Sequence, residues 1–106
     1  METKHFVFKG EDFISRDSVF RMFENKLTPH IYDNWDSLYD WITDLSWIKE
    51  KHIIIEIVNF DLALTSYPKE KDIFETCLKD ANNYWQLNAN EFLVNEKKLV
   101  EIILHR

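Results

Sequence analysis

Residues 52 to 60 read HIIIEIVNF, and this stretch decides which class of fold the chain can adopt. It is dense in β-branched isoleucine and valine, which favour strands. It is also apolar on both sides of the chain, which is typical of a strand covered on both faces of a sheet. We therefore expect residues 52–60 to form the central strand.

Two further apolar runs predict the neighbouring strands. The run from His5 to Phe8 leads to Gly10, the only glycine in the chain, and predicts a first strand followed by a turn. The sequence LVEIIL at 99–104 predicts the final strand. The residues before it are compatible with an extra C-terminal strand at 91–94, paired in a hairpin, or with an irregular lead-in to the final strand.

The segments between these strands carry apolar residues at helical spacing. Four helices are expected. The first runs from Ser15 to Leu27, with Ser15 or Asp17 as N-cap, and the second from Asp33 or Asn34 to about Ser46, after a stop at Pro29. A short third helix from Leu62 to Tyr67 is ended by Pro68, and a long fourth helix, marked by Ile73, ends near Leu87. Helices alternating with buried strands predict a small α/β domain with a three-stranded, mainly parallel sheet packed with about four helices.

Length and composition limit the classes of function. With 106 residues, 45% of them apolar, residues 1–106 are expected to form a single domain. The single cysteine excludes an internal disulfide, and the first residues do not resemble a signal segment, so we expect a cytoplasmic protein. We also expect the chain to be monomeric when free. The apolar runs are too short to span a bilayer. A net charge of -6 argues against direct binding to nucleic acid or an anionic membrane and favours a basic partner.

The segment HIYDNWDSLYDWITDL at 30–45 holds four aspartates and no lysine or arginine. On a helix, at about 100° per residue, its side chains separate into two faces. The inward stripe consists of Leu38, Ile42 and Leu45, and the outward stripe of Asp33, Asp36, Asp40 and Asp44. Tyr39 lies on the border between the stripes, and Tyr32 lies in the loop before the helix. Such a face is often only a solvated face, but acids without basic partners on the same helix repel one another, which favours a binding role here.

No residue pattern in the chain predicts an enzyme or a cofactor site. There is no glycine-rich phosphate loop, no nucleophile motif and no cysteine or histidine pair at metal-ligand spacing. Cys77 has the spacing of a buried helical residue, so we interpret it as a structural thiol rather than a nucleophile. His30, near Asp33 and Asp36, could bind a divalent ion, but a surface histidine satisfied by a neighbour is the preferred interpretation. We expect no catalytic residues and no metal ligands.

The run GEDFISRDSVFRMFENKL at 10–27, followed by NWDSLYDW at 34–41, resembles the barstar family of intracellular inhibitors of the ribonuclease barnase. The likeness covers roughly residues 5 to 85. It includes the Gly-Glu turn, a first helix of the same length and the Asn-x-Asp-x-Leu-x-Asp spacing at the start of the second helix. The resemblance implies a barstar-like fold in which the loop and second helix plug the active site of a basic ribonuclease.

The resemblance also implies which residues would touch the partner. Asn34, Asp36 and Asp40 match the family's loop asparagine and two interface aspartates. Tyr32 resembles its loop tyrosine, Tyr39 occupies the place of a helix tryptophan, and Asp80 corresponds to a peripheral acid. Trp41 departs from the small residue that the family has at this position.

The sequence therefore predicts an immunity protein that occludes a basic toxin ribonuclease, as in a toxin-antitoxin pair. The alternative is a regulatory module whose acidic face docks a basic partner that is not a nuclease. A metal-dependent hydrolase is the third and most distant interpretation.

Overall fold

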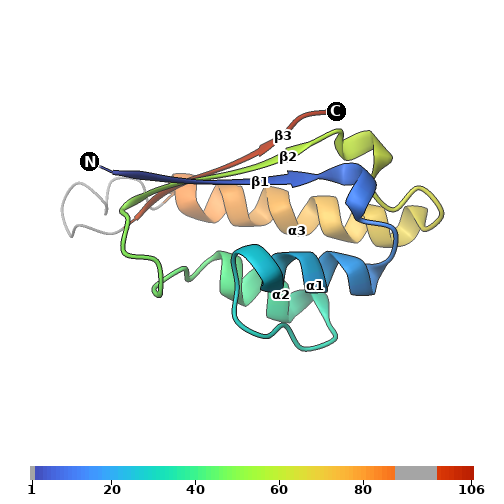
Figure 1. The fold of residues 1–106 in the computed structure, drawn as a ribbon, viewed down its shortest axis with the longest axis horizontal. Helices are drawn as coiled ribbons and strands as arrows, with labels where there is room; N and C mark the ends of the chain where they lie inside the picture. Colours follow the sequence, from blue (N-terminus) through green and yellow to red (C-terminus); the bar gives the residue numbers. More distant parts are fainter. Residues whose placement is uncertain (1, 88–97) are drawn as a thin grey trace.

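The computed structural model describes residues 2–87 and 98–106 and builds them around a parallel three-stranded sheet. The strands are β1 (Thr3–Lys9), β2 (His52–Val58) and β3 (Leu99–Leu104), arranged in the order β1-β2-β3 (Figure 1). Ile55 in β2 is in register with Phe6 in β1 and with Ile102 in β3. The prediction that the isoleucine-rich segment is the central strand is confirmed. The extra strand expected at 91–94 lies outside the described residues.

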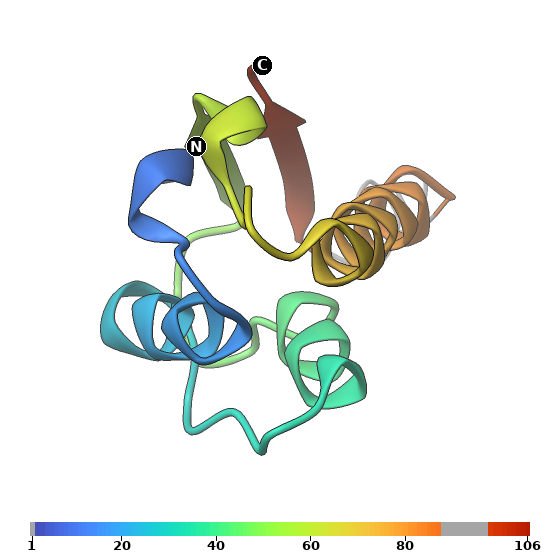
Figure 2. The same cartoon turned by 90° about the vertical axis from the view of Figure 1, so that its right-hand side faces the viewer.

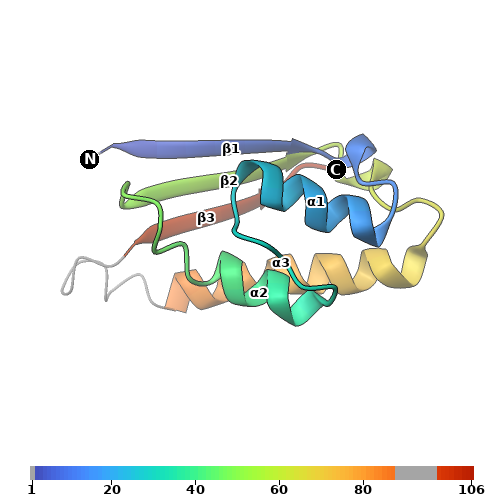
Figure 3. The same cartoon turned by 60° about the horizontal axis from the view of Figure 1, so that its bottom comes forward.

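Three α-helices cover one face of this sheet: α1 (Arg16–Lys26), α2 (Trp35–Ile42) and α3 (Pro68–Leu87). The end-on view shows α3 beside β3, with α1 and α2 below the strands and farther from the sheet (Figure 2). Figure 3 shows α2 lying alongside α3, with the loop after α2 leading back to β2. Within the described part of the chain, no helix is long and apolar enough to cross a membrane.

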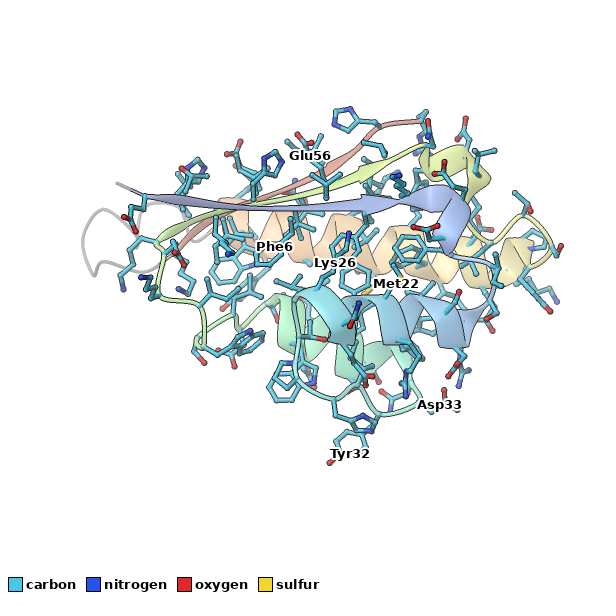
Figure 4. The ribbon with its side chains drawn as sticks, viewed as in Figure 1. Phe6, Met22, Lys26, Tyr32, Asp33 and Glu56 are labelled. Atoms are coloured by element: carbon cyan, nitrogen blue, oxygen red, sulfur yellow. The ribbon has the colours of Figure 1, made fainter. Side chains whose placement is uncertain are left out.

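The expectation that both faces of β2 are covered is wrong. Ile53, Ile55 and Ile57 are fully buried against the helices, whereas the alternate residues of β2 are partly exposed. In Figure 4, Glu56 projects from the face opposite the helices, while Phe6 and Met22 lie between the sheet and α1. The strands follow one another across the sheet in sequence order, and crossovers share one hand, so both connections lie on the same face.

An aromatic core joins the sheet to the three helices. The Phe8 ring on β1 stacks on Phe23 of α1 with 4.5 Å between the ring centroids. Phe74 of α3 meets Phe13 edge to face at 5.3 Å and stacks on Trp35 of α2 at 5.6 Å. The four phenylalanines are fully buried. Burial of this apolar surface is what holds α2 against α1 and α3.

The segment after β2 differs from the expected short helix at 62–67. A 3-10 turn, η2 (Phe60–Leu62), is followed by Leu64 in the left-handed region at φ 51°, where its amide donates to the Phe13 carbonyl at 2.8 Å. Pro68 does not end a helix but begins α3, a position where its missing N–H has no helical partner to lose. The described residues therefore contain three α-helices rather than about four.

The first turn requires glycine. Gly10 begins the 3-10 turn η1 (Gly10–Asp12), which packs against η2 at the ends of β1 and β2. A Cβ atom added to Gly10 would lie 2.0 Å from the carbonyl oxygen of Asn59. Only glycine permits this close backbone approach.

Candidate partner-binding site

The second helix turns its apolar side inward and its acids outward, as its sequence spacing predicts. The Asn34 side-chain oxygen accepts a hydrogen bond from the Ser37 amide at 2.7 Å and caps α2. Leu38 and Ile42 are fully buried, and the Trp85 indole of α3 donates to the Ile42 carbonyl at 2.9 Å. These contacts fix the rotation of α2 about its axis.

The helix is shorter than expected. It ends at Ile42 rather than near Ser46, and Leu45 follows in the left-handed region at φ 57°. Leu45 is fully buried, as predicted, because the chain turns there toward the core.

Three exposed aspartates form a row: Asp36 and Asp40 on the outer side of α2, and Asp44 just beyond its end. Within residues 2–87 and 98–106, none of them forms an ion pair. Asp44 also stands just beyond the C-terminal end of the helix, where the helix dipole disfavours negative charge. This arrangement costs the free protein stability and leaves three carboxylates available to a basic group.

These aspartates line a shallow surface hollow that we call the acidic hollow. Its walls are made by the three aspartates and by Tyr32, Asn34, Ser37 and Trp41. A hollow with carboxylates and aromatic rings on its walls suits an arginine or lysine side chain, because the guanidinium or ammonium group can pair with the acids while its stem packs on the rings.

A second hollow, the interhelix hollow, lies between α2 and α3. It is lined by Trp35, Asp36, Tyr39, Ile73, Thr76, Cys77 and Asp80. Asp36 lines both hollows, so the structure brings Asp80 of α3 next to the acidic row of α2. The sequence alone does not reveal this proximity, although the resemblance implies it.

The charges in the interhelix hollow affect its titratable groups. Burial, together with the nearby carboxylates of Asp80 and Asp36, raises the pKa of the Cys77 thiol to about 12. Burial and the charge of Asp80 also raise the pKa of Tyr39. Cys77 is buried, consistent with a structural thiol, and both side chains stay protonated at neutral pH.

Asp33 stands apart from the other predicted acids. It lies in the loop before α2, and its carboxylate is 3.1 Å from the guanidinium of Arg16 on α1. Arg16 also donates to the Asp33 carbonyl at 2.8 Å. Asp33 lines neither the acidic hollow nor the interhelix hollow, so its side chain helps to hold the loop. A direct contact of Asp33 with a partner stays a prediction.

The loop from Thr28 to Asn34 is held to α1 and α2 by side chains. Arg21 donates to the Ile31 carbonyl at 3.0 Å, and Glu24 accepts from the Ile31 amide at 2.5 Å. The Trp41 indole donates to the His30 carbonyl at 3.0 Å. The loop thereby carries Tyr32, which is 67% exposed and projects away from the body of the protein (Figure 4).

His30 pairs with Glu24 rather than with the aspartates. Its Nδ1 atom is 2.8 Å from the Glu24 carboxylate. Across the described residues, no group of three histidine, cysteine, aspartate or glutamate side chains is arranged to hold a metal ion.

Sequence reasoning missed the surface role of Ile73, which was interpreted only as a residue marking the long helix. Ile73 is 45% exposed and lines the interhelix hollow, whereas its neighbour Phe74 is fully buried. Successive residues on a helix point about 100° apart, so Ile73 need not share the buried face of Phe74, and this was the available signal.

The fold and the site define a small α/β protein with an exposed acidic helix that lacks basic partners within the described residues. Residues 3–97 match the family described as Barstar (barnase inhibitor). The chain belongs to this family, and the match supports a general role as a ribonuclease inhibitor. No curated protein matches the chain closely enough to be counted as a relative.

Proposed function

We propose that the chain is an immunity protein that inhibits a basic toxin ribonuclease in the cytoplasm by covering its active site with α2 and the preceding loop. The observation that carries this proposal is the row of three exposed aspartates, two on α2 and one just beyond its end, which form no ion pair in the described part of the chain. The family match supports the general class of target.

The chemistry of the target explains why carboxylates suit this role. A ribonuclease binds the phosphates of RNA with arginine, lysine or histidine. An inhibitor can meet the same groups with carboxylates, which form short, charge-assisted hydrogen bonds with them. In this proposal Asp36 and Asp40 take the place of substrate phosphates, and Asp44 and Asp80 supply charge at the margin.

The neighbouring aromatic and amide groups complete the surface. Tyr32, Asn34 and Tyr39 surround the acids and would exclude water from the charged centre, which strengthens the electrostatic attraction there. Because the loop is held by hydrogen bonds to α1 and α2, Tyr32 need not be ordered on binding, and the entropic cost of association is reduced.

The experiment measures RNA cleavage by two basic ribonucleases in the presence of the purified chain. One is barnase, and the other is the product of any nuclease gene adjacent to the gene for this protein. We expect one equivalent of the chain to abolish cleavage by at least one of them. Full activity of both enzymes in excess chain would refute the proposal. Capture of a basic protein without nuclease activity would then favour a regulatory docking module.

A further inference from the structure

A hollow of opposite charge lies at the C-terminal end of α2. This lysine hollow is formed by the loop that follows α2, the end of α3 and the start of β3, and its lining includes Asp44, Lys49, Lys51, Trp85 and Lys98. Three lysines and one aspartate meet there, on a chain whose net charge is -6. The local charge is therefore opposite to that of the molecule as a whole.

Hydrogen bonds fix the position of this positive charge. Lys98 donates to the Ile48 carbonyl and, at 2.9 Å, to the Glu50 carbonyl, so it ties the loop between α2 and β2 to the start of β3. Burial lowers the pKa of Lys98, and so does the nearby charge of Lys51, while the carboxylates of Glu50 and Asp44 act in the opposite direction. The fold thus holds two like charges close together.

The other two lysines are available to a partner. Lys49 and Lys51 are exposed, and neither forms an ion pair with another described residue. Repulsion between Lys51 and Lys98 has a cost in the free chain that a bound anionic group would remove.

The lysine hollow is continuous with the candidate site. Asp44 lines both the acidic hollow and the lysine hollow. The surface therefore changes sign across Asp44, from the hollow with Asp36 and Asp40 to the hollow with Lys49 and Lys51. A partner that is basic throughout its contact area would be attracted by the acidic hollow and repelled by the lysine hollow.

We propose that the lysine hollow binds aspartate or glutamate side chains of the same ribonuclease whose basic cleft receives Asp36 and Asp40. This inference rests on the proposed function and narrows it. The target is a ribonuclease with carboxylates beside one end of its cleft, and the lysines set the direction in which α2 lies across that cleft. Targets without these carboxylates are disfavoured by like-charge repulsion.

The test asks whether removing a positive charge from the lysine hollow strengthens or weakens binding to the ribonuclease. Neutralising any lysine makes the chain more acidic, which by itself should strengthen association with a basic ribonuclease. We expect Lys49→Gln and Lys51→Gln to do the opposite and to weaken binding by roughly 3- to 10-fold each. Lys9→Gln is the matched control, because Lys9 is exposed and lies at the end of β1, away from the helix layer. It should bind as tightly as the parent chain or slightly tighter.

Affinity is measured by titration calorimetry against whichever of barnase or the adjacent gene product binds the parent chain more tightly, with each enzyme inactivated by substitution. Thermal unfolding of Lys51→Gln should match or exceed that of the parent, because the repulsion with Lys98 is relieved. If both lysine variants bind as tightly as Lys9→Gln while Asp40→Ala loses affinity, this inference is wrong and the proposed function stands. If the parent chain binds neither enzyme, the proposed function fails and this inference fails with it.

Discussion

Replacing Asp40 with alanine should separate binding from folding more sharply than any other change in the site. Asp40 lies in the middle of the acidic row, one turn after Asp36 and four residues before Asp44, and it is exposed. Like charges at this spacing cost about 0.2 to 0.5 kcal/mol per pair. Asp44 lies beyond the end of α2, so Asp40→Ala removes one such helical pair, with Asp36, and the free protein should become more stable by about 0.2 to 0.5 kcal/mol.

The effect on the complex has the opposite sign and is larger. A hydrogen bond to a charged group contributes about 1.5 to 3 kcal/mol, and its loss leaves the partner's cationic group buried without a counter-charge. We expect Asp40→Ala to weaken binding by at least about 2 kcal/mol, which is about 30-fold in Kd, mostly through faster dissociation. Stopped-flow kinetics with the inhibited ribonuclease and thermal unfolding of the free variant measure the two effects separately.

Two matched variants make this result interpretable. Leu38 is fully buried on the opposite side of α2, so Leu38→Ala should destabilise the fold by about 2 to 5 kcal/mol. Asp12→Ala makes the same chemical change as Asp40→Ala at an exposed position in η1, and it should leave the dissociation rate unchanged. If Asp40→Ala dissociates no faster than Asp12→Ala, α2 is not the inhibitory surface.

The remaining predictions concern screening, acid stability and thiol reactivity. Association with the ribonuclease should slow as salt rises, since charges are screened over about 8 Å at physiological ionic strength, and equal stopped-flow rates at low and high salt would contradict electrostatic docking. Hydrogen bonds from Arg106 and Lys79 lower the pKa of Glu75 from its usual 4.5 to about 2. Its contribution to stability should therefore be present above pH 4.5 and lost as the pH falls toward 2, and urea unfolding at pH 7 and pH 3 should show a smaller loss for Glu75→Gln than for the parent. Because burial raises the pKa of Cys77 to about 12, an alkylating reagent at pH 8 should label the native thiol far more slowly than the thiol in urea, and equal rates would show that Cys77 is accessible in the folded protein.

Periodicity along the chain determined the parts of this protein that depend on neighbouring residues. The isoleucine-rich segment was recognised as a strand because β-branched side chains suit the pleated, half-buried surface of a sheet. The inward position of Leu38 and Ile42 followed from helical spacing, and so did the outward position of Asp36 and Asp40. These predictions are confirmed because 3.6 residues per turn fix which side chains share a face.

Sequence reasoning failed where a contact with a distant part of the chain outweighs the local preference for a helix. Leu62 to Tyr67 has apolar residues at helical spacing, yet Leu64 takes a left-handed conformation so that its amide can reach Phe13 and its side chain can enter the core. Burial of a leucine together with a long-range hydrogen bond outweighs a weak local helix preference. The same competition ends α2 at Ile42 and turns Leu45 inward.

Only the tertiary structure decided which distant residues meet. No periodic pattern in the sequence relates the segments that meet in three places. Arg16 pairs with Asp33, Asp80 lies near Asp36, and Lys98 binds the loop before β2. The open face of the sheet likewise follows from the path of both crossovers along one side. Local spacing fixes the face that each element buries. The relative placement of the elements is set by close packing of the whole core, here by the rings of Phe8, Phe23 and Phe74. That placement gives the site its shape and brings its acidic and basic hollows together.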